Sequence, residues 1–192
     1  MADQQEKQLK TMQDYVGDMV ALESHIEEAL DRQLKETKDH PLANAAVQRF
    51  HDMVKHNRDH MKEYQGQIGT TGGNPIAAVG SAVLGKAAGV IDMIRSEGIS
   101  KALRDDYTAF NLAAMGYTML YTTSTAFGNT QLASICEEHL RNYAKAIQEL
   151  NQLVPSVVLD ELAKDDHQVN PGVAGQVRSM VNEAWKDTNP TS

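Results

Sequence analysis

The stretch MQDYVGDMVALESHIEEALDRQL, residues 12–34, decides the fold class, because its apolar residues recur at intervals of three and four. At about 100° per residue these side chains fall in one stripe roughly 100° wide, which is the pattern of an amphipathic helix. The stripe consists of Met12, Tyr15, Val16, Met19, Ile26, Leu30 and Leu34. Glu23 lies in the middle of it. Because burying an unpaired carboxylate costs several kcal/mol, we expect this acid to be paired, hydrogen-bonded, protonated or bound to a metal ion.

The same spacing continues outward from this stretch and predicts four long helices. They are expected at about 5–37, 42–67, 99–127 and 130–153. Pro41 suits the first turn of the second helix, and Gly128-Asn129 is a helix stop followed by a new start. Short turns at these two places predict two tight antiparallel hairpins.

The connection over about 68–98 is much longer than either hairpin turn. Two hairpins joined by one long crossover is the topology of ferritin-like bundles. A chain of 192 residues with 41% hydrophobic content supports one core rather than two. The sequence therefore predicts a single all-α domain over 1–192. It is expected to be a ferritin-like four-helix bundle at about 5–153, followed after Pro155 by a C-terminal helical extension at about 155–187.

Composition argues against several classes of partner and compartment. The formal charge of -8 and the pI near 5.3 disfavour nucleic acid and anionic membranes, because both would meet a repelling surface. Cys136 is the only cysteine, so no intramolecular disulfide can form. The polar start MADQQEKQLK lacks the basic and apolar regions of a secretory signal. These features predict a cytoplasmic protein.

The long connection contains two motifs that suggest a ligand or a membrane. Residues 80–87, GSAVLGKA, have the G-x-x-x-x-G-K spacing of a phosphate-binding loop, but alanine stands where a magnesium-binding Ser or Thr is needed. Residues 76–94 are apolar, yet Lys86, Asp92 and the frequent Gly and Ala argue against a membrane span. We expect neither nucleotide binding nor a membrane span here, and instead a buried crossover or an oligomer contact.

The helix expected at 99–127 is apolar on two faces, since Leu112, Met115 and Met119 lie opposite its core-facing stripe. A helix with two apolar faces is buried on both, so the second face must meet the crossover or another subunit. This pattern predicts a homodimer or larger homo-oligomer, with a protein partner as the alternative.

Polar residues of the other helices are expected to meet Glu23 inside the bundle. The apolar stripe of the second helix is centred near Asn57, and His60 lies at its edge. Measured from the first hairpin turn, both lie at the level of Glu23. The third helix directs Tyr117 into the core, and the fourth directs Tyr143 there and offers no acid.

Across roughly residues 10–153 the chain resembles the ferritin-like stress proteins of the YciE and YciF type. The resemblance rests on Tyr15 with Glu23, on His60 as the histidine of a degenerate Glu-x-x-His, and on Tyr117 in a helix ending at Ala126-Phe127-Gly128. It implies a cytoplasmic dimer, a stress-related role and a di-metal centre. Ferritin-like centres use about four carboxylates and two histidines, with Glu-x-x-His on two helices.

Carried over residue by residue, that ligand set is incomplete. Glu23 matches the first Glu and His60 the first His, but Asn57 stands where the Glu of the pair is needed. The acid of the third helix falls at or near Ala113 or Ala114, and the acid of the fourth falls near a tyrosine. Two adjacent divalent ions held by so little negative charge would repel each other.

Two interpretations of these residues follow. In the first, they form a self-satisfied buried polar network that supplies register rather than chemistry. Its members are Glu23, Asn57, His60, Tyr117 and Tyr143. In the second, Glu23, His60 and Tyr143 hold iron or manganese in a reduced metal site.

The sequence favours the first interpretation and a non-catalytic ferritin-like protein that acts through its surfaces, with no cofactor and no catalytic residue assigned. The stress-related role rests on the resemblance alone. The alternative is an iron- or manganese-binding ferritin-like oxidoreductase with a reduced ligand set.

Overall fold

The computed structural model describes residues 2–69 and 98–187 and is all-helical over these ranges. The helices are α1 (Ala2–Glu36), α2 (Pro41–Ile68), α4 (Ile99–Ala126), α5 (Thr130–Lys164) and α6 (Val173–Asp187). The predicted all-α bundle is confirmed. No helix in the described ranges is long and apolar enough to cross a membrane.

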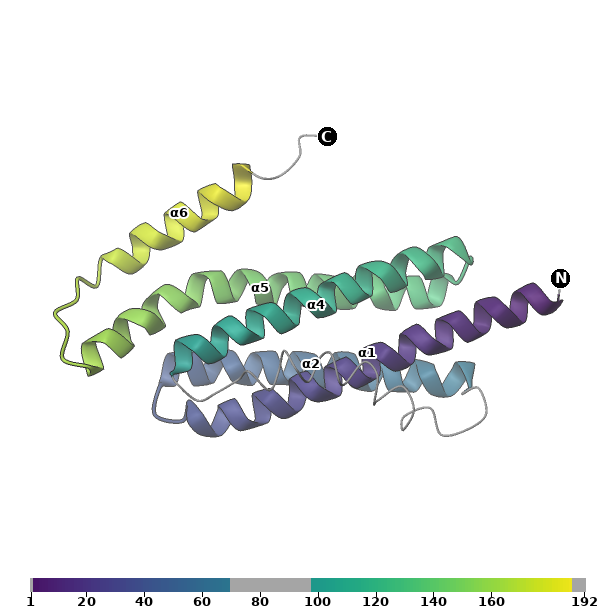
Figure 1. Cartoon of the computed structure of the whole chain (residues 1–192), viewed down its shortest axis with the longest axis horizontal. Helices are drawn as coiled ribbons and strands as arrows, with labels where there is room; N and C mark the ends of the chain where they lie inside the picture. The colour runs from purple at the N-terminus through teal and green to yellow at the C-terminus, as the bar shows by residue number, and fades with distance from the viewer. Residues whose placement is uncertain (1, 70–97, 188–192) are drawn as a thin grey trace.

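The four long helices form two antiparallel hairpins, α1 with α2 and α4 with α5 (Figure 1). The hairpins pack through α1 against α4 and through α2 against α5. The end of α2 and the start of α4 lie at opposite ends of the bundle, which is the crossover topology of ferritin-like folds (Figure 1). The crossover residues 70–97, with the glycine motif at 80–87 and the apolar stretch at 76–94, lie outside the described residues.

The first hairpin turn is fixed by a histidine cap. His40 precedes α2, and its Nδ1 accepts a hydrogen bond from the backbone N–H of Ala43 at 3.3 Å. Pro41 occupies the first turn, as predicted, where its missing N–H costs no helical hydrogen bond. The other ring nitrogen of His40 lies 3.3 Å from Oδ2 of Asp160 on α5, so the cap also ties the turn to the second hairpin.

The second hairpin turn joins a left-handed glycine to an asparagine cap. Gly128 has φ 72°, a conformation that costs glycine nothing and strains other residues. The side chain of Asn129 accepts from the N–H of Leu132 at 3.0 Å and donates to the hydroxyl of Tyr64 at 2.7 Å. The turn is therefore held to α2 as well as capped.

The structure corrects the predicted break at Pro155, because α5 passes through this residue without ending. A proline inside a helix removes one N–H donor and crowds the preceding turn. Core packing offsets that loss, and α6 contacts the same turn of α5. Leu153 and Val157 on either side are buried in the core, and Arg178 of α6 donates to the carbonyl of Gln152 at 2.8 Å. The C-terminal extension is therefore the last part of α5 together with α6, which packs against α5.

Candidate functional site

The centre of the bundle contains one buried acid held by two tyrosines. Glu23 of α1 is fully buried. Tyr117 of α4 donates its hydroxyl hydrogen to Oε1 of Glu23 at 2.8 Å, and Tyr143 of α5 donates to the same oxygen at 3.1 Å. The structure thus brings together three of the residues singled out from the sequence.

A histidine absent from the predicted site connects this centre to the edge of the bundle. Nδ1 of His139 lies 2.8 Å from the hydroxyl of Tyr117, and its Nε2 lies 3.2 Å from Nδ1 of His60. The hydrogen of Tyr117 goes to Glu23, so Nδ1 of His139 is the donor to Tyr117 and Nε2 accepts from His60. His60 is therefore linked to Glu23 through His139 and Tyr117.

The spacing of His139 from its apolar neighbours indicates a buried position, although its side chain is polar. It lies three residues after Cys136 and four before Tyr143, so it falls on the core-facing stripe of its helix. The structure places His139 beside His60, whereas the metal site predicted from the sequence took Tyr143 from this helix. The bundle centre thus has two histidines rather than one.

Asn57 is also buried, and it contacts polar atoms of both α5 and its own helix α2. Its Oδ1 accepts from Asn142 at 3.0 Å, and its Nδ2 lies 3.4 Å from the sulfur of Met53. A hydrogen bond with Asn57 also lowers the pKa of Tyr143, partly opposing the effect of burial. Asn57 therefore lies at the edge of the polar centre, beside Tyr143.

Burial sets the protonation of this centre. Loss of solvent raises the pKa of Glu23 to about 8, although the bonds from Tyr117 and Tyr143 and the charge of Arg58 act in the opposite direction. Burial, with the neighbouring His60 and His56, lowers the pKa of His139 to about 3.

The two tyrosines stay neutral as well. Burial and the neighbouring Glu23 raise the pKa values of Tyr117 and Tyr143 well above the ordinary value. At neutral pH the centre therefore combines a protonated carboxyl, a neutral imidazole and two neutral phenols.

These residues do not fit a pair of metal ions. Asn57-x-x-His60 and Cys136-x-x-His139 repeat the spacing of the two Glu-x-x-His motifs, but each has lost its Glu. Burial raises the pKa of the Cys136 thiol to about 12, so without a metal ion this residue adds no negative charge in place of the missing Glu. With Ala113 buried on α4, Glu23 is the one buried carboxyl at this level of the described helices.

One atom of the centre has no partner. Oε2 of Glu23 is buried and makes no hydrogen bond within the part of the chain that the structure describes. A proton resides most easily on this oxygen, since Oε1 already accepts two hydrogen bonds. The geometry thus agrees with the raised pKa of Glu23.

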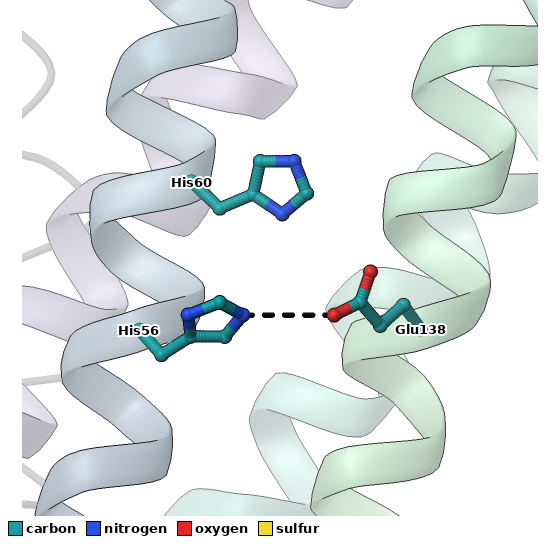
Figure 2. A group of neighbouring side chains, drawn as sticks. All are labelled: His56, His60 and Glu138. Carbon is teal, nitrogen blue, oxygen red and sulfur yellow. Dashed lines mark ion pairs between the residues drawn. The ribbon is translucent and has the colours of Figure 1, made fainter.

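A second group of side chains lies at the edge between α2 and α5. His56 and His60 of α2 face Glu138 of α5, and one ligand atom from each lies within 4.8 Å of the others (Figure 2). Nε2 of His56 is 3.6 Å from Oε1 of Glu138. Both are exposed, and they meet each other across the two helices.

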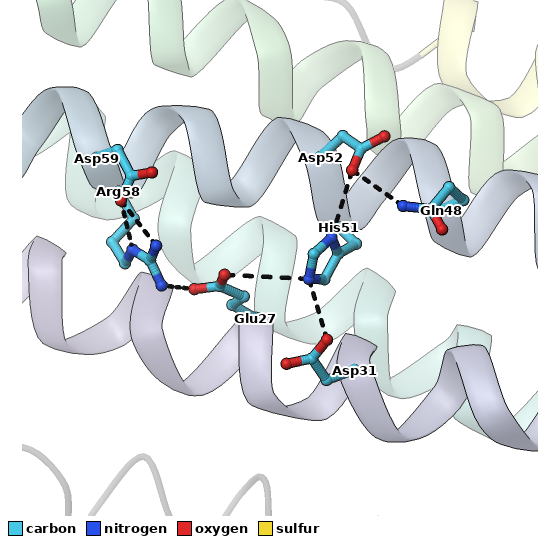
Figure 3. A network of polar contacts seen from close by, with 7 residues as sticks. All are labelled: Glu27, Asp31, Gln48, His51, Asp52, Arg58 and Asp59. Atoms are coloured by element: carbon cyan, nitrogen blue, oxygen red, sulfur yellow. Dashed lines mark hydrogen bonds and ion pairs between the residues drawn. The ribbon is translucent and has the colours of Figure 1, made fainter.

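The remaining histidine of α2, His51, belongs to a network of ion pairs on the outside of the first hairpin (Figure 3). Its Nε2 lies 3.1 Å from Asp31 of α1, and its Nδ1 lies 3.4 Å from Asp52. Arg58 of α2 pairs with Glu27 of α1 in the same network. Every polar contact here joins α1 to α2 or stays within α2, so its role is to hold the hairpin in register.

A further buried polar pair joins the two hairpins away from Glu23. Gln33 of α1 donates from Nε2 to Oδ1 of Asp106 of α4 at 2.7 Å. Burial raises the pKa of Asp106 to about 7, the bond from Gln33 lowers it, and the charge of Asp105 raises it. Asp106 lies three residues after Leu103 and four before Phe110, so it shares their buried stripe. The predicted site did not include this pair.

One family model matches the chain. It is described as a domain of unknown function (DUF892), and the match covers residues 9–163. No curated protein and no solved structure shows significant similarity to the chain.

Proposed function

The chain belongs to the DUF892 family, and we propose that it is a non-catalytic ferritin-like protein of the YciE and YciF type that acts through its surfaces. In this proposal the buried centre is a structural network derived from a metal site. The observation that carries the proposal is the bonding of Glu23, whose Oε1 accepts from both Tyr117 and Tyr143.

Charge supports a structural role for this network. Two divalent ions bring four positive charges into a poorly solvated interior, where ion pairs and oxygen ligands must offset the lost hydration. The centre offers one carboxyl, and burial favours its protonated form. Neutral hydrogen-bonded groups instead satisfy one another and fix the register of three helices, α1, α4 and α5.

The outer face of α4 supports an interaction role. Leu112, Met115 and Met119 are 46%, 59% and 52% exposed in the single chain. Apolar side chains gathered on one helix face indicate a surface that contacts another molecule. We propose that a second copy of the chain covers this face, giving a homodimer or larger homo-oligomer. A different protein partner is the alternative.

The cellular setting in this proposal is the cytoplasm, in a stress-related role. The cytoplasmic setting is supported by the single, buried Cys136, whose thiol needs no oxidising compartment. The stress-related role is supported by the resemblance to the YciE and YciF proteins.

One observation favours the competing function, an iron- or manganese-binding oxidoreductase using Glu23, His60 and Tyr143. Oε2 of Glu23 has no hydrogen-bond partner among the described residues. His139, a neutral imidazole, would add a nitrogen ligand. This site would hold a single ion.

Metal analysis separates the two functions. The full-length chain is produced with iron and manganese in the medium, and both metals are measured in the purified wild type and in Glu23→Gln. The Gln variant keeps an acceptor for the two tyrosines and removes the carboxyl. We expect iron and manganese well below one ion per chain in both proteins. Near-stoichiometric iron or manganese that disappears in Glu23→Gln would establish the oxidoreductase instead.

The assembly is tested through its size in solution. Light scattering is expected to show a dimer or larger species for the wild type and a monomer for Met115→Glu. Lys62→Glu, an exposed change on α2, is the charge control and should leave the size unchanged. A monomeric wild type would contradict the homo-oligomer and favour a different protein partner for this face.

A further inference from the structure

We infer that His56, His60 and Glu138 form a mononuclear transition-metal site, best suited to zinc, at the edge between α2 and α5. It is separate from the buried carboxyl of Glu23, and it goes beyond the proposed structural role of the bundle centre.

The helix geometry of α2 presents two imidazoles on one face. His56 and His60 are four residues apart, so their side chains lie one above the other on the helix. Their ring centroids are 6.1 Å apart. Two histidines at this spacing are a recurrent way for one helix to bind zinc.

The third ligand comes from the facing helix. Glu138 of α5 directs its carboxylate toward the two rings (Figure 2), with Oε1 3.6 Å from Nε2 of His56. A carboxylate with two imidazoles is a donor set that zinc accepts, and water can occupy the fourth position. Among the described residues this is the one group of three such side chains with converging ligand atoms.

A small rotation of exposed side chains brings the ligand atoms to the spacing around a bound ion. Zinc bonds of about 2.0–2.2 Å in a tetrahedron place ligand atoms roughly 3.3–3.6 Å apart. The three ligand atoms here lie within 4.8 Å of one another. The side chains of His56 and Glu138 are 61% and 53% exposed, so both are free to rotate toward a shared ion without disturbing the core.

The buried side chain of His139 orients His60, which is the half-buried ligand of this site. His139 is fully buried and lies 3.2 Å from His60, with its other nitrogen bonded to Tyr117. Groups behind a metal ligand fix the orientation of its ring and strengthen binding. His60 is therefore held in place before a metal ion arrives, whereas an isolated surface His–Glu pair lacks such support.

Zinc titration tests this site. The full-length chain without a polyhistidine tag is stripped of metal with a chelator and titrated calorimetrically with Zn²⁺. We expect one zinc ion per chain. His56→Ala should weaken binding by about 100-fold or more, since loss of a supporting group alone costs about 10–100-fold. Glu138→Gln should weaken it by at least about 10-fold. Co²⁺ in place of Zn²⁺ should give the visible absorption of a tetrahedral site, and His56→Ala should abolish it.

Two matched variants locate the ion. His25→Ala removes another surface histidine, which lies 4.0 Å from Glu28 on α1, and should leave zinc affinity unchanged. Glu23→Gln should also leave it unchanged if the variant retains its helical circular dichroism. Zinc binding that His56→Ala and His25→Ala affect equally, or no binding at millimolar zinc, would overturn the proposal.

Loss of zinc binding in a folded Glu23→Gln variant would show that the ion binds at the bundle centre. That result would also overturn the site at His56, His60 and Glu138. The proposed structural role of the centre fails on a different result, namely Glu23-dependent iron or manganese. The two proposals can therefore fail independently.

Discussion

Tyr117 donates to Oε1 of Glu23 at 2.8 Å and accepts from His139 with the same hydroxyl group. Tyr143 donates to that oxygen as well, at 3.1 Å, and has its other contact with Asn57. Tyr117 is thus the link between the buried acid and the two histidines of the bundle centre, His139 and His60.

The first prediction follows from this double role. Tyr117→Phe should lower the free energy of unfolding by about 1–3 kcal/mol, because it removes a donor to Glu23 and leaves the N–H of His139 without an acceptor. Tyr143→Phe should cost less, since Glu23 keeps its bond from Tyr117. Urea unfolding followed by circular dichroism measures both. Tyr121→Phe, at an exposed position of the same helix, is the control, and an equal loss in this variant would contradict the role of Tyr117.

The free energy of unfolding should depend on pH because Asp106 is buried. Its pKa is about 7 in the folded chain and about 3.9 when unfolded. Between these values the folded state binds more protons at Asp106 than the unfolded state, so the contribution of Asp106 to the free energy of unfolding falls as pH rises from about 4 to about 7 and then levels off. Asp106→Asn should remove this loss and stabilise the protein at pH 8 by an amount on the order of 2–4 kcal/mol.

The measurement is a series of urea unfolding curves from pH 5 to about pH 8. Glu23 also has a raised pKa and contributes a similar slope to both proteins, so the difference between wild type and variant isolates Asp106. Asp39→Asn changes an exposed carboxylate and should leave the curve unaltered. A difference between Asp106→Asn and wild type that does not vary with pH would show that Asp106 is ionised throughout.

The cap at His40 should contribute measurably to stability. His40→Ala removes the acceptor for the N–H of Ala43, and losses of this kind cost about 1 kcal/mol. His40→Asn should recover most of that amount, because asparagine caps helices well but does not reach Asp160. Thermal unfolding of the two variants compares them. An Ala variant at least as stable as the Asn variant would contradict a stabilising role of the cap, because both variants lack the contact with Asp160.

Docking of α6 should depend on Arg178. This side chain donates to the carbonyl of Gln152 and to Ser156, while Ala174 is the one buried residue over the part of α6 up to residue 186. Arg178→Ala should release α6 and leave the four-helix bundle folded. Limited proteolysis between residues 165 and 172 should become faster, and the fluorescence of Trp185, the only tryptophan, should change.

Lys186→Ala, an exposed change near the end of α6, is the matched control and should leave proteolysis unchanged. Loss of the global unfolding transition in Arg178→Ala would instead show that α6 is part of the bundle's cooperative unit.

Much of the fold follows from local sequence. The spacing of apolar residues fixed which face of α1 is buried, and Glu23 in the middle of that face is indeed fully buried. Pro41 and Gly128-Asn129 located both hairpin turns, because turn chemistry depends on a few adjacent residues. The predicted end at Pro155 was wrong, because the burial of neighbouring residues outweighs the local cost of the proline.

The candidate site was only partly predictable. His139 and Asp106 lie on the buried stripes of their helices, so their spacing indicates burial. Their polar side chains, however, are not counted when a stripe is defined by apolar residues. Their partners could not be found in this way. Nothing local to Asp106 indicates that Gln33, on another helix, will donate to it.

The sequence by itself determined that the chain forms a helical bundle with an acid at its centre, since periodicity sets the direction of each side chain around its own helix. Only the tertiary structure decided that Glu23 meets two tyrosines, that His60 meets His139, and that His56 faces Glu138. Those contacts depend on how far each helix is shifted and rotated against its neighbour. Packing of the whole core sets these two quantities, and no single helix encodes them.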